Sequence, residues 1–461
     1  MKLKQYRFNK GLLFGYLSWS SASIASAAVW YLGLFPGRIG YDSIQAINLM
    51  RDNRSTDWWT GWYFRVLELS TFRGNSIWLA SLISLCTLYL ALKFFIFSLP
   101  INKAVMEKVV FAMCLSPLFG NFAVTVSHDT FFASGILLLV GYSFRVRSGF
   151  NSRAIQYIPI AVAVLLLTSK SGYIALAGFL VFLFFCRTPA FKVFIYICFT
   201  ISVFALSNIG ISKSSVPLEI MPAVADLKCV TQHPEANISK SEWNFLATIN
   251  PIENWKEPAT CSSMDEALIP LSDSNIELVD RWEFFKYYLS IASKNPVIVI
   301  QAHLQRSSEA LPPPFFQGPE NQVDQDIKNP IGLNTNTALQ LGPEVLHPSI
   351  DDPSLKMDLG PFIYVQHLLL FFSFLINQAS WFWGWGGLWL WPTILIPTVY
   401  FRVTRFKDLL AVSYPILTNH LFLTVFGPIP APRYVMSTVL IGLTYTLVTV
   451  IGWFDKLRSG E

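Results

Sequence analysis

Long apolar runs constrain what this chain can fold into more than any other feature of its sequence. They recur from residues 11–34 to residues 193–210 and return after residue 360. Crossing about 30 Å of hydrocarbon takes about 20 apolar residues in a helix, and several runs approach that length. Of the 461 residues, 53% are hydrophobic and 14% are charged, a balance that excludes an ordinary soluble domain. The sequence therefore predicts an all-α polytopic membrane protein.

Lys and Arg clusters predict which side of the membrane each connection faces, because basic residues resist translocation. The start of the chain is basic and has no convincing signal-peptide cleavage site, so we expect a cytoplasmic N-terminus. Residues 1–210 are predicted to form an N-terminal module with a long outer loop, residues 35–75. Its seven crossings are 11–34, 76–99, 109–126, 131–144, 154–168, 173–186 and 193–210.

A second group of apolar runs predicts a C-terminal transmembrane part, residues 361–461. Its segments are 361–379, 386–401, 408–426 and 434–453. If all four cross, the chain has eleven spans and Arg402 and Arg405 lie outside, against the charge rule. If the Trp-rich stretch 381–385 holds one segment in the membrane interface, the chain has ten spans and these charges lie inside. We favour ten.

The segment between these groups, residues 211–360, has a different composition. It holds 20 of the 29 acidic and 10 of the 34 basic residues, so its net charge is near −10, while the remaining 9 acidic and 24 basic residues leave the rest near +15. This indicates a soluble extracytoplasmic α(+β) domain with a helix over residues 282–300. Its only cysteines, Cys229 and Cys261, are a disulfide candidate on the oxidising side. Two free thiols are the alternative, because connectivity cannot be read from sequence.

Two acids and one cation are predicted to share the outer side of the N-terminal module. Asp42 follows the first span, Asp129 lies in the turn after the third, and Lys170 lies in a predicted turn over residues 168–172. Each acid also has a structural explanation. Asp42 with Gln45 three places on resembles a helix N-cap with a capping box, and Asp129 at a helix start suits the helix dipole. Lys170 interrupts an apolar stretch, which marks a functional candidate unless it snorkels to the interface.

The outer loop is rich in arginine, which short translocated loops usually avoid. Arginine binds phosphate through paired hydrogen bonds, but it can also pair with local acids, as Arg65 could with Glu68 at i, i+3. One His beside one acid does not make a metal site, so a divalent cation is left open. The candidates for substrate or phosphate binding are Arg38, Gln45, Arg73, His128, Lys170 and Arg433. Asp42 and Asp129 are the catalytic candidates, because a carboxylate can take a proton while cations hold developing phosphate charge.

Four short motifs stand out: Pro36-Gly37…Gly40-Tyr41-Asp42-Ser43…Gln45, Ser127-His128-Asp129-Thr130-Phe131, Lys170-Ser171-Gly172-Tyr173 and Gly427-Pro428…Pro432-Arg433-Tyr434. Together they resemble the GT-C superfamily, and within it the bacterial multi-spanning transferases that use polyprenyl-phosphate sugars. In that family the first outer loop carries the catalytic aspartate, which matches Asp42, and a second acid follows the third span, which matches Asp129. The resemblance covers residues 11–210 and the last Arg-Tyr turn. It departs at Asp57-Trp58-Trp59-Thr60, where many relatives carry a His-Pro pair, so acceptor choice and metal use stay open.

The resemblance implies an inverting glycosyltransferase of the bacterial inner membrane. It would move a sugar from a polyprenyl-phosphate carrier to an extracytoplasmic glycan or glycolipid, such as a lipopolysaccharide O-antigen. The lipid bilayer would be a further partner, and no nucleic-acid partner is expected. A flippase or transporter for a lipid-linked glycan is one alternative, but it would be expected to show broken helices or internal repeats, which we do not find. A glycan polymerase or ligase is another, since it also combines outer-loop arginines with a large outer loop. The early Asp-Ser pair and the second acid favour the transferase.

Overall fold

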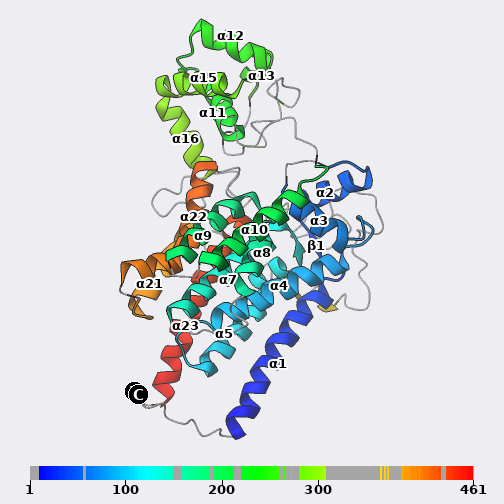
Figure 1. The fold of residues 1–461 in the computed structure, drawn as a ribbon, viewed down its shortest axis with the longest axis vertical. Helices are drawn as coiled ribbons and strands as arrows, with labels where there is room; N and C mark the ends of the chain where they lie inside the picture. The colour runs from blue at the N-terminus through cyan, green and yellow to red at the C-terminus, as the bar shows by residue number, and fades with distance from the viewer. Residues whose placement is uncertain are drawn as a thin grey trace.

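The computed structural model is a bundle of long helices with a smaller helical domain at one end (Figure 1). Within its described residues the only strands are two of two residues each. The structure describes residues 10–55, 59–148, 157–185, 190–211, 220–258, 261, 264, 271, 280–307, 364–365, 368–369, 371–372, 386–403, 405–426 and 432–459. Most of the predicted segment 361–379, the Trp-rich stretch 381–385 and residues 427–431 lie outside these ranges.

The bundle is organised around α7 (His128–Arg147), which is buried from Asp129 to Phe144. Such all-round burial is expected of a helix that is apolar on every side. Helix α7 packs against α4, α8, α22 and α23. The other bundle helices are α1 (Lys10–Gly33), α4 (Trp78–Ile96), α5 (Lys103–Leu115), α6 (Pro117–Val124), α8 (Ile158–Leu166), α9 (Lys170–Phe185), α10 (Ala190–Ser207), α21 (Gly386–Val399), α22 (Phe406–Phe426) and α23 (Pro432–Ser459).

Three described helices are long and apolar enough to cross a membrane: Trp78–Ile96, His128–Arg147 and Val435–Leu457. The predicted runs 76–99, 131–144 and 434–453 are confirmed as such helices. The predicted crossing 109–126 is instead a pair, α5 and α6, bent by 68°. The bend falls at Ser116, which is extended with ψ 129°, because the residue before Pro117 avoids helical geometry. With this pair counted as one, up to four spans are described, so the ten predicted crossings stay a prediction.

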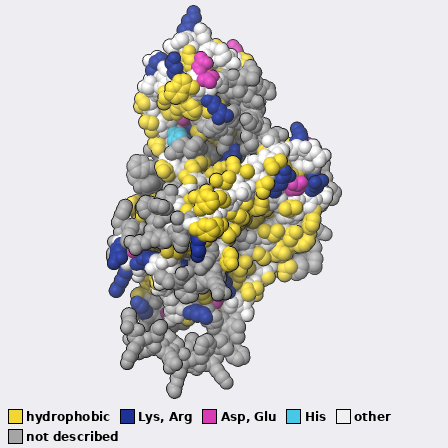
Figure 2. Space-filling model, in the orientation of Figure 1, with side chains coloured by type: hydrophobic (Ala, Val, Ile, Leu, Met, Phe, Trp, Pro, Cys, Tyr) yellow, Lys and Arg dark blue, Asp and Glu magenta, His cyan; other side chains and the backbone are white. Residues whose placement is uncertain are grey.

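The outside of the bundle is suited to lipid. Figure 2 shows hydrophobic side chains spread across its face. Helix α10, for example, exposes Phe191 at 72%, Phe194 at 62% and Leu206 at 67% of their surface. Large apolar groups exposed on this scale are costly in water and mark a surface that another apolar phase covers. The chain is therefore an all-α protein with membrane-spanning character.

Contacts between helix ends gather the basic connections at one end of the bundle. Arg147 Nε at the end of α7 lies 3.5 Å from Asp408 Oδ2 in the first turn of α22. Lys108 Nζ in the middle of α5 lies 2.6 Å from Asp455 Oδ1 near the end of α23. Arg405 lines a pocket together with Arg147 and Asp408. We call this the basic end of the bundle, and the opposite end, which holds the two strands, the strand end (Figure 1).

At the strand end, the predicted outer loop folds back on the bundle. It contains β1 (Arg38–Ile39), α2 (Tyr41–Arg51) and α3 (Gly61–Ser70). Strand β1 pairs in parallel with β2 (Thr125–Val126), which follows α6. Gly37 turns the chain from α1 into β1 with a φ of 122°, and a Cβ there would lie 2.2 Å from Ser81 Oγ. Glycine is needed at this position because it alone adopts such a φ readily and leaves room for Ser81.

The described part of the insert is a separate helical domain with its own apolar core, which includes Leu246, Trp255 and Phe284. The predicted helix 282–300 is split at Asn295, ahead of Pro296. None of the described residues of the insert forms a strand, so the predicted β part has no counterpart there. The helices are α11 (Met221–Gln232), α12 (Lys240–Ile249), α13 (Ile252–Lys256), α15 (Arg281–Lys294) and α16 (Pro296–Arg306).

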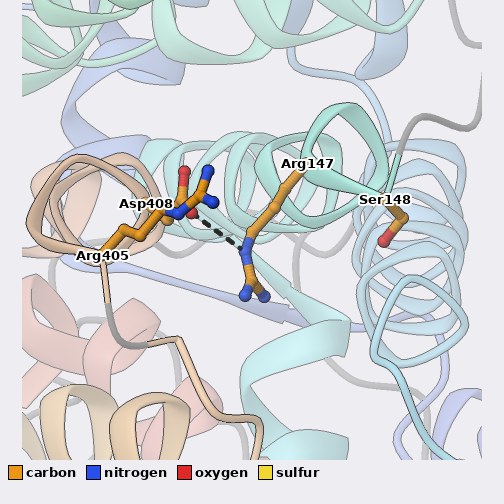
Figure 3. Close-up of a pocket in the computed structure, with 4 residues that line it drawn as sticks. All are labelled: Arg147, Ser148, Arg405 and Asp408. Atoms are coloured by element: carbon orange, nitrogen blue, oxygen red, sulfur yellow. Dashed lines mark ion pairs between the residues drawn. The ribbon is translucent and has the colours of Figure 1, made fainter.

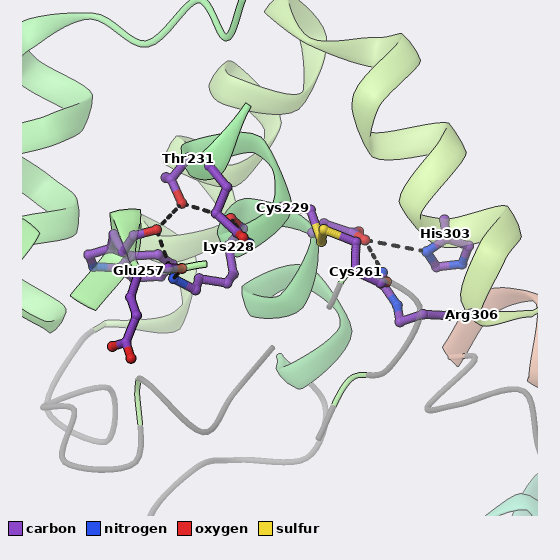
Figure 4. Close-up of a disulfide and its surroundings, with 10 residues drawn as sticks. Lys228, Cys229, Thr231, Glu257, Cys261, His303 and Arg306 are labelled. Carbon is purple, nitrogen blue, oxygen red and sulfur yellow. Dashed lines mark hydrogen bonds and ion pairs between the residues drawn. A yellow bond between two sulfur atoms is a disulfide. The ribbon is translucent and has the colours of Figure 1, made fainter. Parts of the chain in front are cut away.

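The predicted disulfide of the insert is confirmed. Cys229 and Cys261 are bonded, with Cα atoms 5.6 Å apart. The carbonyl of Cys261 accepts a hydrogen bond from Arg306 Nη1 at 3.3 Å, and the other Nη of Arg306 is bonded to buried Asp226 (Figure 4). From the same helix, Nε2 of His303 lies 2.6 Å from the carbonyl oxygen of Thr424 on α22. The disulfide thus stabilises the insert internally, and α16 joins the insert to the bundle through α22.

Candidate functional site

The two short strands bring together parts of the chain that are far apart in sequence. Their register pairs Arg38 with Thr125 and Ile39 with Val126. The N–H of Gly40 then donates to the carbonyl of Val126 at 3.3 Å. Each strand runs directly into a helix, β1 into α2 and β2 into α7. The starts of these two helices therefore lie beside each other.

Both predicted catalytic acids occupy equivalent positions in this arrangement. Asp42 is the second residue of α2, and Asp129 is the second residue of α7. A carboxylate in the first turn interacts favourably with the helix dipole. The N-cap of α2 is Gly40, however, and no side chain caps that helix. The alternative interpretation of Asp42 as an N-cap with a capping box is therefore wrong, because the helix begins two residues earlier than that pattern requires.

The start of α7 is held by its own side chains. Ser127 Oγ accepts from the N–H of Asp129 at 3.1 Å and donates to its Oδ2 at 3.1 Å. Nε2 of His128 lies 3.5 Å from Asp129 Oδ1, and Asp129 is only 3% exposed. The other ring nitrogen, Nδ1 of His128, is buried and has no hydrogen-bond partner within the described part of the chain. Leaving a buried polar atom without a hydrogen bond is costly. A ligand that formed a hydrogen bond with Nδ1 would remove this cost and bind more tightly.

Tyr63 of α3 links the two helix starts and was not foreseen from the sequence. Its fully buried hydroxyl lies 2.7 Å from Ser43 Oγ, which itself donates to the carbonyl of Val126 at 2.8 Å. Burial raises the pKa of Tyr63, and the charges of Asp129 and Asp42 raise it further. Both acids therefore lie close enough to act on one phenol, which stays protonated. A single tyrosine in an arginine-rich loop carries no sequence signal of this role.

Arg38 places a buried cation in the strand that leads to Asp42. Its side chain is 3% exposed, and Nη1 donates to Asn121 Oδ1 at 2.6 Å. No carboxylate of the described residues forms an ion pair with it, and burial lowers its pKa to about 10. Taking a charge out of water without an opposite partner costs several kcal/mol. Arg38 therefore leaves an uncompensated positive charge at the strand end.

Lys170 reaches the same end by a different route. It is the first residue of α9, which corrects the predicted turn over residues 168–172. The preceding segment is tied to the site because Thr60 Oγ1 donates to the carbonyl of Thr168 at 3.0 Å. The hydroxyl of Thr168 in turn lies 3.5 Å from the carbonyl oxygen of His128. The starts of α7 and α9 are therefore neighbours, as the prediction that Asp129 and Lys170 share one side requires.

Not every predicted site residue lies beside Asp42 and Asp129. Arg73 lies past the end of α3, with Nε 3.4 Å from Glu68 Oε1 and 77% of its side chain exposed. Glu68 also pairs with Arg65 at 2.9 Å, so the predicted local i, i+3 pairing is confirmed. Gln45 is half-buried one turn after Asp42. Arg433 is in the first turn of α23, and its side chain is outside the described part.

The chemical capacity of the site follows from these groups. Asp42, half-buried at the start of α2, is placed to accept a proton, and Asp129 is fixed by Ser127 and His128. Arg38 supplies positive charge. Among the described residues, no group of three or more His, Cys, Asp and Glu side chains could hold a metal ion, so the divalent cation left open above has no ligand set here.

Comparisons of the chain with protein-family models, curated proteins and solved structures find no match. The interpretation of the site therefore rests on its own residues and their geometry.

Proposed function

We propose that this chain is a membrane glycosyltransferase of the GT-C type. It would take a sugar from a polyprenyl-phosphate carrier and place it on a glycan or glycolipid at the outer face of the bacterial inner membrane. The proposal is carried by the β1–β2 register, which sets two acid-bearing helix starts side by side at the strand end. An acid pair supplied by two separate loops suits a reaction between two substrates that arrive at one membrane face.

Asp42 would be the general base. The acceptor hydroxyl attacks the anomeric carbon, its proton passes to the Asp42 carboxylate, and the bond from that carbon to the phosphate oxygen breaks. The leaving group departs with the electron pair as polyprenyl phosphate, and the anomeric configuration inverts. A positioned carboxylate contributes about 10²–10⁴-fold to such a step. Asp42 suits the task because it is half-buried. The N-cap position of its helix is occupied by Gly40, so the Asp42 carboxylate does not serve as that cap.

Arg38 would stabilise the negative charge that develops on the departing phosphate. Preorganised cations act strongly on such charge in a site that excludes water. Arg38 has the required property, since it is buried and no described carboxylate neutralises it. Lys170, at the start of α9, and the unpaired Nδ1 of His128 are further groups that an anionic donor could engage. The buried positive charge thereby gains a counterion when donor binds.

The decisive experiment is mass analysis of lipid-linked and envelope glycans in a strain that lacks the gene. A transferase predicts the loss of one sugar-sized mass from the glycan, with its chain length intact and the lipid-linked donor still present at the outer face. Restoring the wild-type gene should restore the mass, whereas an Asp42→Asn gene should not. Loss of donor from the outer face would instead indicate a flippase or transporter. A changed chain-length distribution would indicate a polymerase or ligase, and either result would overturn the proposal.

A further inference from the structure

A polar pocket lies at the basic end of the bundle, away from the acids of the strand end. It is formed where α7 ends and α22 begins, and its volume is about 390 Å³ (Figure 3). Small-ligand sites typically measure about 300–1,000 Å³ and are mostly apolar. This pocket has the volume, but its described lining residues are polar or charged: Arg147, Ser148, Arg405 and Asp408. Its chemistry therefore points to a charged ligand.

Arg147 is held in the pocket from two sides. Its Nε lies 3.5 Å from Asp408 Oδ2, and its Nη2 donates to the carbonyl of Arg402 at 3.4 Å. Figure 3 shows Arg147 and Asp408 turned toward each other. Arg402 has a φ of 52°, a left-handed backbone value that residues other than glycine rarely adopt. An uncommon backbone conformation between α21 and α22 therefore presents the carbonyl that steadies this guanidinium.

The charge of the pocket is positive. Among the lining residues that the structure describes, Asp408 is the one carboxylate, and it pairs with Arg147. Arg405 is exposed, and none of the carboxylates in the described ranges forms an ion pair with it. One guanidinium is thus left over. It stands just before the first residue of α22, where the helix dipole also favours an anion.

We propose that this pocket binds the phosphate group of an anionic ligand through Arg405, with Arg147 and the hydroxyl of Ser148 orienting it. Guanidinium groups recognise phosphate oxygens by charged, often paired, hydrogen bonds. Basic pockets between helices at the cytoplasmic side of a membrane bind anionic head groups in this way. A lipid head group and a soluble phosphate offer the same chemistry, and the two can be told apart experimentally.

The test uses the full-length protein in phosphatidylcholine nanodiscs, with phosphatidylglycerol added to the bilayer or inorganic phosphate added to the buffer. The thermal unfolding midpoint is measured for the wild type, for Arg405→Gln and for a control, Arg54→Gln. The control removes the same charge from an exposed pair with Asp52 in the predicted outer loop. We expect phosphatidylglycerol to raise the midpoint of the wild type and the control. In Arg405→Gln its apparent affinity should fall about fivefold, the contribution of one basic side chain near an anionic surface.

Each outcome decides a specific point. A response to phosphatidylglycerol alone that requires Arg405 assigns the pocket to a lipid head group. A response to inorganic phosphate that also requires Arg405 assigns the same pocket to a soluble phosphate. If Arg405→Gln responds to both probes as the wild type does, or if the wild type responds to neither, the proposal is overturned. Arg405 is exposed and has no described ion pair, so its substitution leaves the fold intact and the comparison interpretable.

Discussion

The two strand-to-helix junctions at the strand end have the same spacing but are stabilised in different ways. At the β2–α7 junction, Ser127 caps the helix and binds both the N–H and the carboxylate of Asp129, which is 3% exposed. At the β1–α2 junction, Gly40 occupies the cap position without any side-chain hydrogen bond, and Asp42 is half-buried. Two equivalent positions therefore hold acids in unlike surroundings.

The difference assigns different roles to the acids. Asp129 is buried and hydrogen-bonded to Ser127, so its position is fixed. A base must meet a substrate proton at hydrogen-bond distance, which suits the more accessible Asp42. We infer that Asp42 takes the proton and that Asp129 orients the acceptor or the elements around it.

The largest expected effect is that of Asp42→Asn. Asparagine keeps the size of the side chain but cannot serve as a base, so sugar transfer by the reconstituted protein should fall at least about a hundredfold. Membrane insertion and donor binding should persist. Transfer is measured with a polyprenyl-phosphate sugar donor and purified acceptor. A near normal rate would return Asp42 to a purely structural role.

Asp129→Asn sharpens the same comparison. Asparagine can still accept hydrogen bonds from Ser127, so the helix start should survive and the loss of transfer should be smaller than that of Asp42→Asn. The two variants are compared in the same transfer assay, and the order of the two losses separates the roles. A larger loss with Asp129→Asn than with Asp42→Asn would exchange the two assignments.

The next effect concerns Arg38, whose register partner in β2 is the neutral Thr125. Removing a buried charge that has no described opposite partner also removes its desolvation cost of several kcal/mol. Arg38→Met should therefore leave the thermal midpoint unchanged or raise it, while the donor concentration needed for half-maximal transfer rises by roughly tenfold, as for a lost charged hydrogen bond. A matched control is Arg73→Met, which removes an exposed arginine that pairs with Glu68. Equal donor requirements in both variants would remove Arg38 from the site.

The sequence predicts the parts of this fold that depend on local composition. Apolar runs located α4, α7 and α23 because the length and hydropathy of a span are visible without any tertiary information. Counting those runs also put Asp42 and Asp129 on one side. The cysteine pair was predictable because both residues lie in the one segment with a soluble composition.

What could not be predicted depends on contacts between distant segments. Strands of two residues are too short to show a periodic pattern, so the β1–β2 register has no sequence signature. Tyr63 gains its role only through contacts with Ser43 and the nearby acids. The arginines of the outer loop look alike in sequence, yet Arg38 is buried whereas Arg73 pairs with Glu68 at the surface. Local composition could not separate them, because burial decides which charge is left uncompensated.

The smallest expected effect tests the junctions themselves through their cap residues. Ser127→Ala removes the side chain that accepts from the N–H of Asp129, and losing such a cap costs about 0.5–2 kcal/mol of stability. Gly40→Ala should cost nothing of this kind, because α2 has no side-chain cap there to lose. Its φ of −76° and ψ of 152° suit alanine. The added Cβ would meet only ordinary contacts, 3.8 Å from the carbonyl oxygen of Val126 and 3.9 Å from Ser127 Cβ.

The two cap variants should therefore differ in thermal stability. Restricting the unfolded chain by replacing glycine with alanine at a compatible position stabilises a protein by about 0.4–1 kcal/mol. We expect the unfolding midpoint of Gly40→Ala in detergent to equal or exceed that of the wild type, and that of Ser127→Ala to lie below it. Ser127→Asp, which restores a capping oxygen but adds a charge beside Asp129, should recover only part of the loss. If both alanine variants lowered the midpoint equally, the junctions would be alike in their stabilisation, and the different roles assigned to Asp42 and Asp129 would lose their structural basis.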